Sequence, residues 1–193
     1  MPKSLSVKNS PPPTDRLTRE EWLERTLEAI GWLGRGPSSI DELVAAVGMS
    51  KGSFYWHFEN RADFVECFLN YWVDEYTAKI PGLVNAHGDS AEEKLLFLAE
   101  SVTRLGVARY DVAMHAWALL EEKVAVAVEK AEAIRFDFVG SLFAGIGFKG
   151  RELEMRTRTF VTYYSFEPGL QAAISESARM AQVKLRHELL VRR

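Results

Sequence analysis

The 193-residue sequence has a single cysteine, Cys67, which excludes a framework of internal disulfides. It has four histidines, and none belongs to a His-Glu-x-x-His motif or a cysteine cluster, so we expect no metal site. The longest nearly apolar run, residues 138–148, contains three glycines and is too short to cross a bilayer. Residues 1–16 lack the apolar segment of a secretory signal, so a cytoplasmic location is expected.

An excess of positive charge is also missing. The sequence has 24 Lys and Arg against 27 Asp and Glu, a formal net charge of −3. Taken alone, this balance argues against a nucleic-acid-binding protein. The apolar share of 47% and the charged share of 26% are ordinary for a globular protein, so wholesale disorder is excluded.

Strict apolar–polar alternation is absent as well, and helical periodicity runs through almost the whole chain after Leu17. We therefore predict an all-α fold of about nine helices. A polar, disordered tail over residues 1–16 precedes a three-helix unit over 17–60, and a larger bundle follows over 61–193. Capping boxes are expected at Thr18 with Glu21 and at Ser39 with Glu42. A fourth helix, opened by Asn60, is expected to end at Pro81-Gly82.

The second and third predicted helices, joined by a turn at Gly48, have the spacing of a helix-turn-helix. At 100° per residue, Phe54 and Phe58 share the inward side of the third helix. The outward side then carries four residues: Gly52, Ser53, Tyr55 and Trp56. The alternative is that the aromatic pair Tyr55 and Trp56 also belongs to the core.

Residues 47–61 read Val-Gly-Met-Ser-Lys-Gly-Ser-Phe-Tyr-Trp-His-Phe-Glu-Asn-Arg. This segment resembles the recognition region of TetR-family (TetR/AcrR-like) transcriptional regulators, which show a Gly-x-Ser turn, a Tyr-x-His-Phe signature and a basic residue at the start of the fourth helix. The resemblance implies phosphate contacts from Tyr55, His57 and Arg61. It implies base or backbone contacts from Ser50, Lys51, Ser53 and Trp56, with Gly52 permitting a close approach to the DNA.

Phe54 replaces the leucine usual in that family, and Arg61 replaces the common lysine. The first change alters core volume, and the second keeps the positive charge while adding bidentate geometry. Neither change argues against binding to double-stranded DNA.

The aromatic-rich second part resembles the effector-binding domain of that family, which encloses a mostly apolar pocket. The residues that we expect to line it share large side chains with few polar tips. They are Trp72, Met114, His115, Trp117, Phe136, Tyr163 and Tyr164. The alternative is that these side chains form ordinary core.

The last two long helices carry apolar stripes, Leu153, Phe160, Val161 and Tyr164, and then Met180, Val183, Leu185, Leu189 and Leu190. In the family this pair of helices forms a homodimer interface, which would place two reading helices one DNA turn apart over a palindrome. The alternative is that the stripes pack only within the chain.

The resemblance implies a repressor that binds a palindromic operator as a dimer and is released by a small, mostly apolar effector. An activator, or a regulator without a ligand, remains possible on sequence alone. A helical ligand-binding protein or enzyme that has lost DNA binding is the main alternative, and we expect no catalysis. The segment Gly145-Ile-Gly-Phe-Lys-Gly150 matches a dinucleotide motif, but a helical pattern precedes it, so we expect no cofactor.

The charge balance also differs between the two parts. Residues 1–61 hold eight Lys and Arg and eight Asp and Glu, so the whole negative charge falls on residues 62–193. A neutral DNA-binding unit predicts weak non-specific affinity and dependence on two paired units for a specific site.

Overall fold

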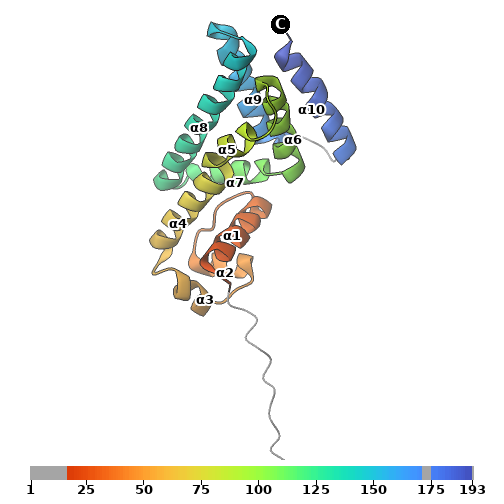
Figure 1. Ribbon diagram of the computed structural model, residues 1–193. Helices are drawn as coiled ribbons and strands as arrows, with labels where there is room; N and C mark the ends of the chain where they lie inside the picture. The colour runs from red at the N-terminus through yellow and green to blue at the C-terminus, as the bar shows by residue number, and fades with distance from the viewer. Residues whose placement is uncertain (1–16, 171–174, 193) are drawn as a thin grey trace, which may run out of the picture.

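The computed structural model describes residues 17–170 and 175–192, in which helices are joined by short connections and no strand occurs (Figure 1). The all-α prediction is therefore confirmed. The tail predicted over residues 1–16 lies outside the described residues. The α-helices are α1 (Arg19–Leu33), α2 (Ile40–Val47), α3 (Lys51–His57), α4 (Arg61–Val73), α5 (Ile80–Asn85), α6 (Ala91–Leu105), α7 (Ala108–Ala118), α8 (Glu122–Ile146), α9 (Gly150–Leu170) and α10 (Glu176–Val191).

The N-terminal unit of α1, α2 and α3 begins as its capping signals predict. The Thr18 hydroxyl accepts a bond from the Glu21 N–H, and the Glu21 carboxylate accepts one from the Thr18 N–H at 2.6 Å. The second predicted box is only half formed. Ser39 caps α2, but the Glu42 carboxylate accepts from the Ser38 N–H at 2.7 Å and from Arg35. The neighbouring cation and the Ser38 donor occupy the oxygens that a full box needs.

One aromatic core joins this unit to the bundle. Trp22 packs edge-on against Phe54 and Phe58, with ring centroids 6.0 and 6.1 Å away. The same buried cluster continues along α4 into α7, where it includes Trp72 and Trp117. The packing is thus continuous across the boundary at residue 60. Helix α7 lies between the N-terminal unit and the upper bundle, the name used here for α5, α6, α8, α9 and α10 (Figure 1).

The fourth helix does not end at Pro81-Gly82 as predicted. It ends at Val73, a π-helical turn follows over Asp74–Ala78, and Pro81 opens the short helix α5. Proline is tolerated in the first turn of a helix because the N–H that it lacks has no intrahelical acceptor there. Here Pro81 therefore starts a helix where the sequence predicted a stop.

A second buried cluster holds the upper bundle together, with α5, α6, α8, α9 and α10 contributing side chains. Helix α10 packs against α6 at the edge of the molecule (Figure 1). Gly147 caps the C-terminus of α8 with a backbone in the left-handed region. The segment 145–150, which matches the dinucleotide motif in sequence, is therefore the end of a helix and the turn that follows it. None of the described helices is long and apolar enough to span a membrane.

The connection between α1 and α2 approaches α7 unusually closely at Gly36. A Cβ on this residue would lie 2.0 Å from Cδ2 of the buried Trp117 ring. Only glycine therefore fits between the backbone and the ring at this point.

We expect Gly36→Ala to lower the free energy of unfolding by about 1–3 kcal/mol, because the added methyl group must displace a packed ring. Thermal unfolding of the full chain measures this effect. Gly82→Ala is the control, since no atom lies within 4 Å of its Cβ position. Equal melting temperatures for the two variants would contradict the packing described here.

Candidate nucleic-acid interface and internal cavity

The turn between α2 and α3 is built around Gly48, whose φ of 73° lies in the left-handed region. Glycine adopts this conformation without the steric penalty that a Cβ brings. Ser50 follows and caps α3, its hydroxyl accepting from the Ser53 N–H at 3.1 Å. Together these residues set the angle between the two helices of the helix-turn-helix.

Helix α3 has one buried and one exposed side. Phe54 and Phe58 are buried as predicted, whereas the side chains of Tyr55 and Trp56 are 56% and 68% exposed. The alternative that all four residues belong to the core therefore fails for this pair. Lys51 and Gly52 are exposed too, and Lys51 pairs with Asp41 of α2 at 2.6 Å.

Ser53 and His57 lie at the edges of this surface, since both are half-buried. Ser53 was expected to face outward, but its hydroxyl accepts a bond from Nε1 of the buried Trp22 at 3.0 Å. That bond satisfies the indole N–H in the core, so Ser53 has a structural role. DNA contacts from either residue stay predictions.

The hydrogen bonds of Arg61 go to residues outside α3. Its guanidinium donates to both carboxylate oxygens of Glu121, at 3.2 and 2.7 Å, and to the Pro37 carbonyl at 3.2 Å. This pairing holds the pKa of Glu121 below its usual range. Arg61, which was predicted to contact a DNA phosphate, is thus bonded to the turn between α7 and α8.

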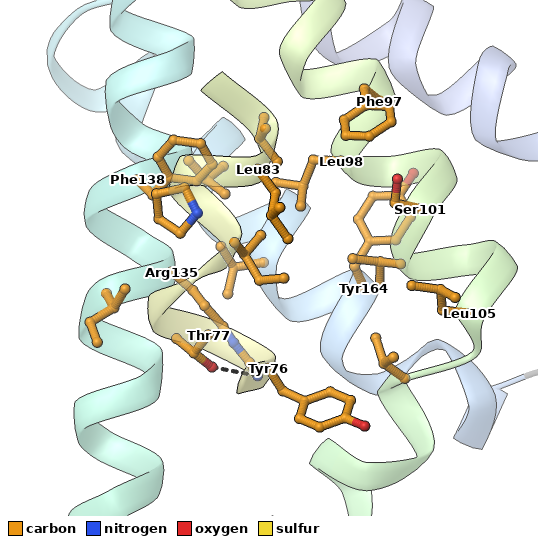
Figure 2. Close-up of a pocket in the computed structure, with 18 of the residues that line it drawn as sticks. Tyr76, Thr77, Leu83, Phe97, Leu98, Ser101, Leu105, Arg135, Phe138 and Tyr164 are labelled. Carbon is orange, nitrogen blue, oxygen red and sulfur yellow. Dashed lines mark hydrogen bonds between the residues drawn. The ribbon is translucent and has the colours of Figure 1, made fainter. Parts of the chain in front are cut away.

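A cavity of about 620 Å³ lies inside the bundle (Figure 2). The π-helical turn and α5 form one wall, and α6, α7, α8 and α9 form the others. Most lining side chains are apolar, including Leu83, Phe97, Leu98, Leu105 and Phe138. The position agrees with a ligand site in the bundle, but the lining differs from the set nominated from sequence.

Only Tyr164 of the seven nominated residues lines this cavity. Trp72, Met114 and Trp117 are buried in the core shared with the N-terminal unit. The other three lie elsewhere: His115 pairs with Glu132, Phe136 borders a smaller groove of about 370 Å³ between α8 and α9, and Tyr163 bonds to Arg186. Ligand contacts from these residues stay predictions.

The cavity wall contains one buried ion pair. Arg135 of α8 donates to both oxygens of Asp111 of α7, at 2.8 and 3.0 Å, and to the Thr77 hydroxyl at 3.1 Å (Figure 2 shows the Thr77 bond). Burial raises the pKa of Asp111, while Arg135 acts to lower it. Because each charge is paired, the wall presents little net charge to a ligand.

Sequence reasoning missed Asp111, Arg135 and Thr77. An acid and a base within otherwise apolar helices were the available signal, but their pairing depends on how α7 and α8 pack. No group of three His, Cys, Asp or Glu side chains suited to a metal ion occurs among the residues that the structure describes.

Residues 26–67 match the family model described as bacterial regulatory proteins, tetR family. The chain is 31% identical over 72 residues to the HTH-type transcriptional regulator AcrR of Shigella flexneri, and the match covers 34% of each protein. The chain thus spans about a third of the length of that curated relative.

Solved structures match over most of the chain. A TetR-family transcriptional regulator from Streptomyces coelicolor superposes with a TM-score of 0.63 at 16% identity, covering 91% of this chain and 89% of that one. The transcriptional regulator FadR from Bacillus subtilis, in complex with stearoyl-CoA, gives 0.63 at 14% identity, covering 89% and 96%. At these identities the likeness establishes the fold. The matched segment is the helix-turn-helix, so both the fold and this segment are similar to those of TetR-family transcriptional regulators.

Proposed function

We propose that this protein is a TetR-family transcriptional regulator, a cytoplasmic repressor that binds a palindromic operator as a homodimer and is released by a small, mostly apolar effector. The observation that carries the proposal is the placement of the cavity. Its walls include α7 and the π-helical turn that continues α4, and both α4 and α7 share the core of the N-terminal unit. A ligand that favours a different packing of these helices needs to supply only about 1–3 kcal/mol of coupling.

DNA recognition is assigned to the exposed face of α3. Tyr55 and Trp56 offer large side chains to the duplex, and Lys51 offers a cation. Gly52 leaves room for the DNA backbone, since its Cβ position has no close neighbour except the Ser50 hydroxyl at 3.7 Å. His57 and Ser53 complete the edges of the proposed surface.

The effector class follows from the cavity wall. A volume of about 620 Å³ falls in the range of small-molecule sites. Its apolar lining, and an ion pair whose two charges neutralise each other, favour a ligand with an apolar, largely uncharged body. The stearoyl-CoA complex of the Bacillus subtilis FadR, which shares this fold, supports a long acyl chain as the first candidate for this protein.

The homodimer is assigned to α9 and α10. Of the predicted stripes, Phe160, Val161, Tyr164 and Val183 are buried within the chain. Two other stripe residues, Leu185 and Leu189 of α10, are each about 60% exposed, and so is Met155 of α9, which the predicted stripes did not include. Exposed leucines one helical turn apart suit burial against a second copy.

Tyr55→Ala is expected to weaken binding to all DNA sequences by about tenfold, because it removes a backbone contact that carries no sequence information. Fluorescence anisotropy with DNA flanking the protein's own gene measures the affinity. The melting temperature should stay unchanged, since Tyr55 is exposed. Tyr55→Phe is the matched control for the ring. Unaltered affinity in the alanine variant would exclude this face of α3.

Ser101→Phe is expected to fill part of the cavity and abolish the effect of an acyl ligand. The probe is stearate, and the measurement is the change in DNA affinity that it causes. Ser141→Phe adds the same ring at an exposed position of α8 outside the cavity and should respond like the wild type. A full stearate response in the Ser101 variant would place the site elsewhere.

Replacing Leu185 and Leu189 together by Asp is expected to yield a monomer, because two charges would be buried in the interface. Sedimentation measures the mass, and DNA affinity should fall with it. The control is Val126→Asp, which changes an exposed apolar side chain on α8. A double variant that remains dimeric would move the interface away from this face of α10.

A further inference from the structure

The carboxylate of Glu121 connects three segments that are distant in sequence. Glu121 is the residue that precedes α8, in the turn after α7. It accepts two bonds from Arg61 and a third from Nε1 of Trp117, at 3.1 Å. Arg61 in turn donates to the carbonyl of Pro37, which precedes α2. The Arg61 guanidinium thus connects the turn between α7 and α8 with the segment before α2 in the N-terminal unit.

This ion pair is more shielded than the exposed surface pair of Arg158 with Glu154. The side chains of Arg61 and Glu121 are 35% and 24% exposed, whereas Arg158 and Glu154 are both 62% exposed. A bidentate guanidinium–carboxylate pair fixes geometry as well as charge. Partial burial reduces screening by salt, so the pair can hold an orientation.

The packing around the pair is also close. The Trp117 ring that bonds to Glu121 lies against the Gly36 backbone and has its centroid 5.9 Å from that of Phe68. A second connection lies farther along α7, where Arg109 donates to both oxygens of Glu28 of α1, at 3.1 and 2.9 Å. The N-terminal unit is thus held along the length of α7.

We infer that Arg61 is a positioning residue: its pair with Glu121 fixes the orientation of the reading helix relative to the bundle, and DNA phosphates are contacted by other residues. Only three residues separate the end of α3 from Arg61, so a fixed Arg61 restricts the position of α3. A unit held in one orientation loses less freedom on binding, so the pair strengthens DNA affinity without touching DNA. The inference rests on the proposed binding of a palindrome by a dimer.

The test uses the full-length protein and a duplex selected from random-sequence DNA by the wild type. The variants are Arg61→Gln, Glu121→Gln, both together, and the exchanged pair Arg61→Glu with Glu121→Arg. We expect each single change to weaken binding by a similar factor, about five- to thirtyfold. The double Gln variant should be no weaker than either single one, and the exchanged pair should recover most of the affinity.

Two further readouts separate positioning from phosphate contact. The slope of log affinity against log salt should be the same in all variants, since no phosphate contact is lost. One base pair inserted at the centre of the selected site should cost the single variants less affinity than the wild type, because their reading helices are held less firmly. Glu122→Gln removes the same charge one residue along, and the described residues offer Glu122 no ion-pair partner, so it should behave as the wild type.

A phosphate contact from Arg61 predicts the opposite pattern. Glu121→Gln would then bind DNA as tightly as the wild type or tighter, and Arg61→Gln would lower the salt slope by about one unit per subunit. The exchanged pair would bind worst, because it places a carboxylate beside DNA. Any of these results overturns the inference, as does unchanged affinity in every variant. If the exchanged pair does not fold, as judged by its melting curve, Glu121→Gln alone decides. A wild type that selects no sequence contradicts DNA binding itself.

Discussion

The contact between the N-terminal unit and α7 is the constraint on which the rest of the structure depends. Trp117 fills the space above Gly36, and the buried cluster runs without a break from Trp22 to Trp72. Each large apolar side chain buried there contributes about 1.5–3 kcal/mol. The N-terminal unit, including α3, therefore cannot rotate freely on a flexible linker. Any change in its orientation has to move α4 and α7 or repack the core between them.

Ion pairs at the edges of this core restrict the relative orientation of the helices that meet there. Arg109 pairs with Glu28 of α1, and Arg61, which is paired with Glu121, also donates to the Pro37 carbonyl of the N-terminal unit. Apolar packing tolerates small sliding movements, whereas bidentate pairs require one geometry. Asp111, which lies on α7 between these pairs, bonds to Arg135 in the cavity wall. The same helix thus borders the cavity on one side and the DNA-binding unit on the other.

The sequence was sufficient for features that depend on neighbouring residues. The capping box of Thr18, the turn at Gly48 and the buried positions of Phe54 and Phe58 could all be predicted because each follows from local spacing. Features set by packing were not accessible. The bond from Trp22 to Ser53 and the pairing of Arg61 depend on helices that are distant along the chain.

The cavity shows the same division. A bundle of helices with an apolar interior was predicted, but the nominated aromatic residues mostly pack in the shared core. Large rings fill space efficiently, so they close a core, while smaller side chains such as Val102 and Ser101 leave room beside them. The π-helical turn was also missed, because one additional residue in a helix leaves no mark on a short periodic pattern.

The π-helical turn makes the number of residues between α4 and α5 important. A residue added to a helical turn rotates everything after it by about 100° relative to a continuous α-helix. The segment Asp74–Ala78 therefore sets the phase between α4, which follows α3 along the chain, and α5, which lines the cavity. A deletion or insertion there would turn α5 away from the cavity. Among related chains, we expect the length of this segment to vary less than its amino-acid sequence.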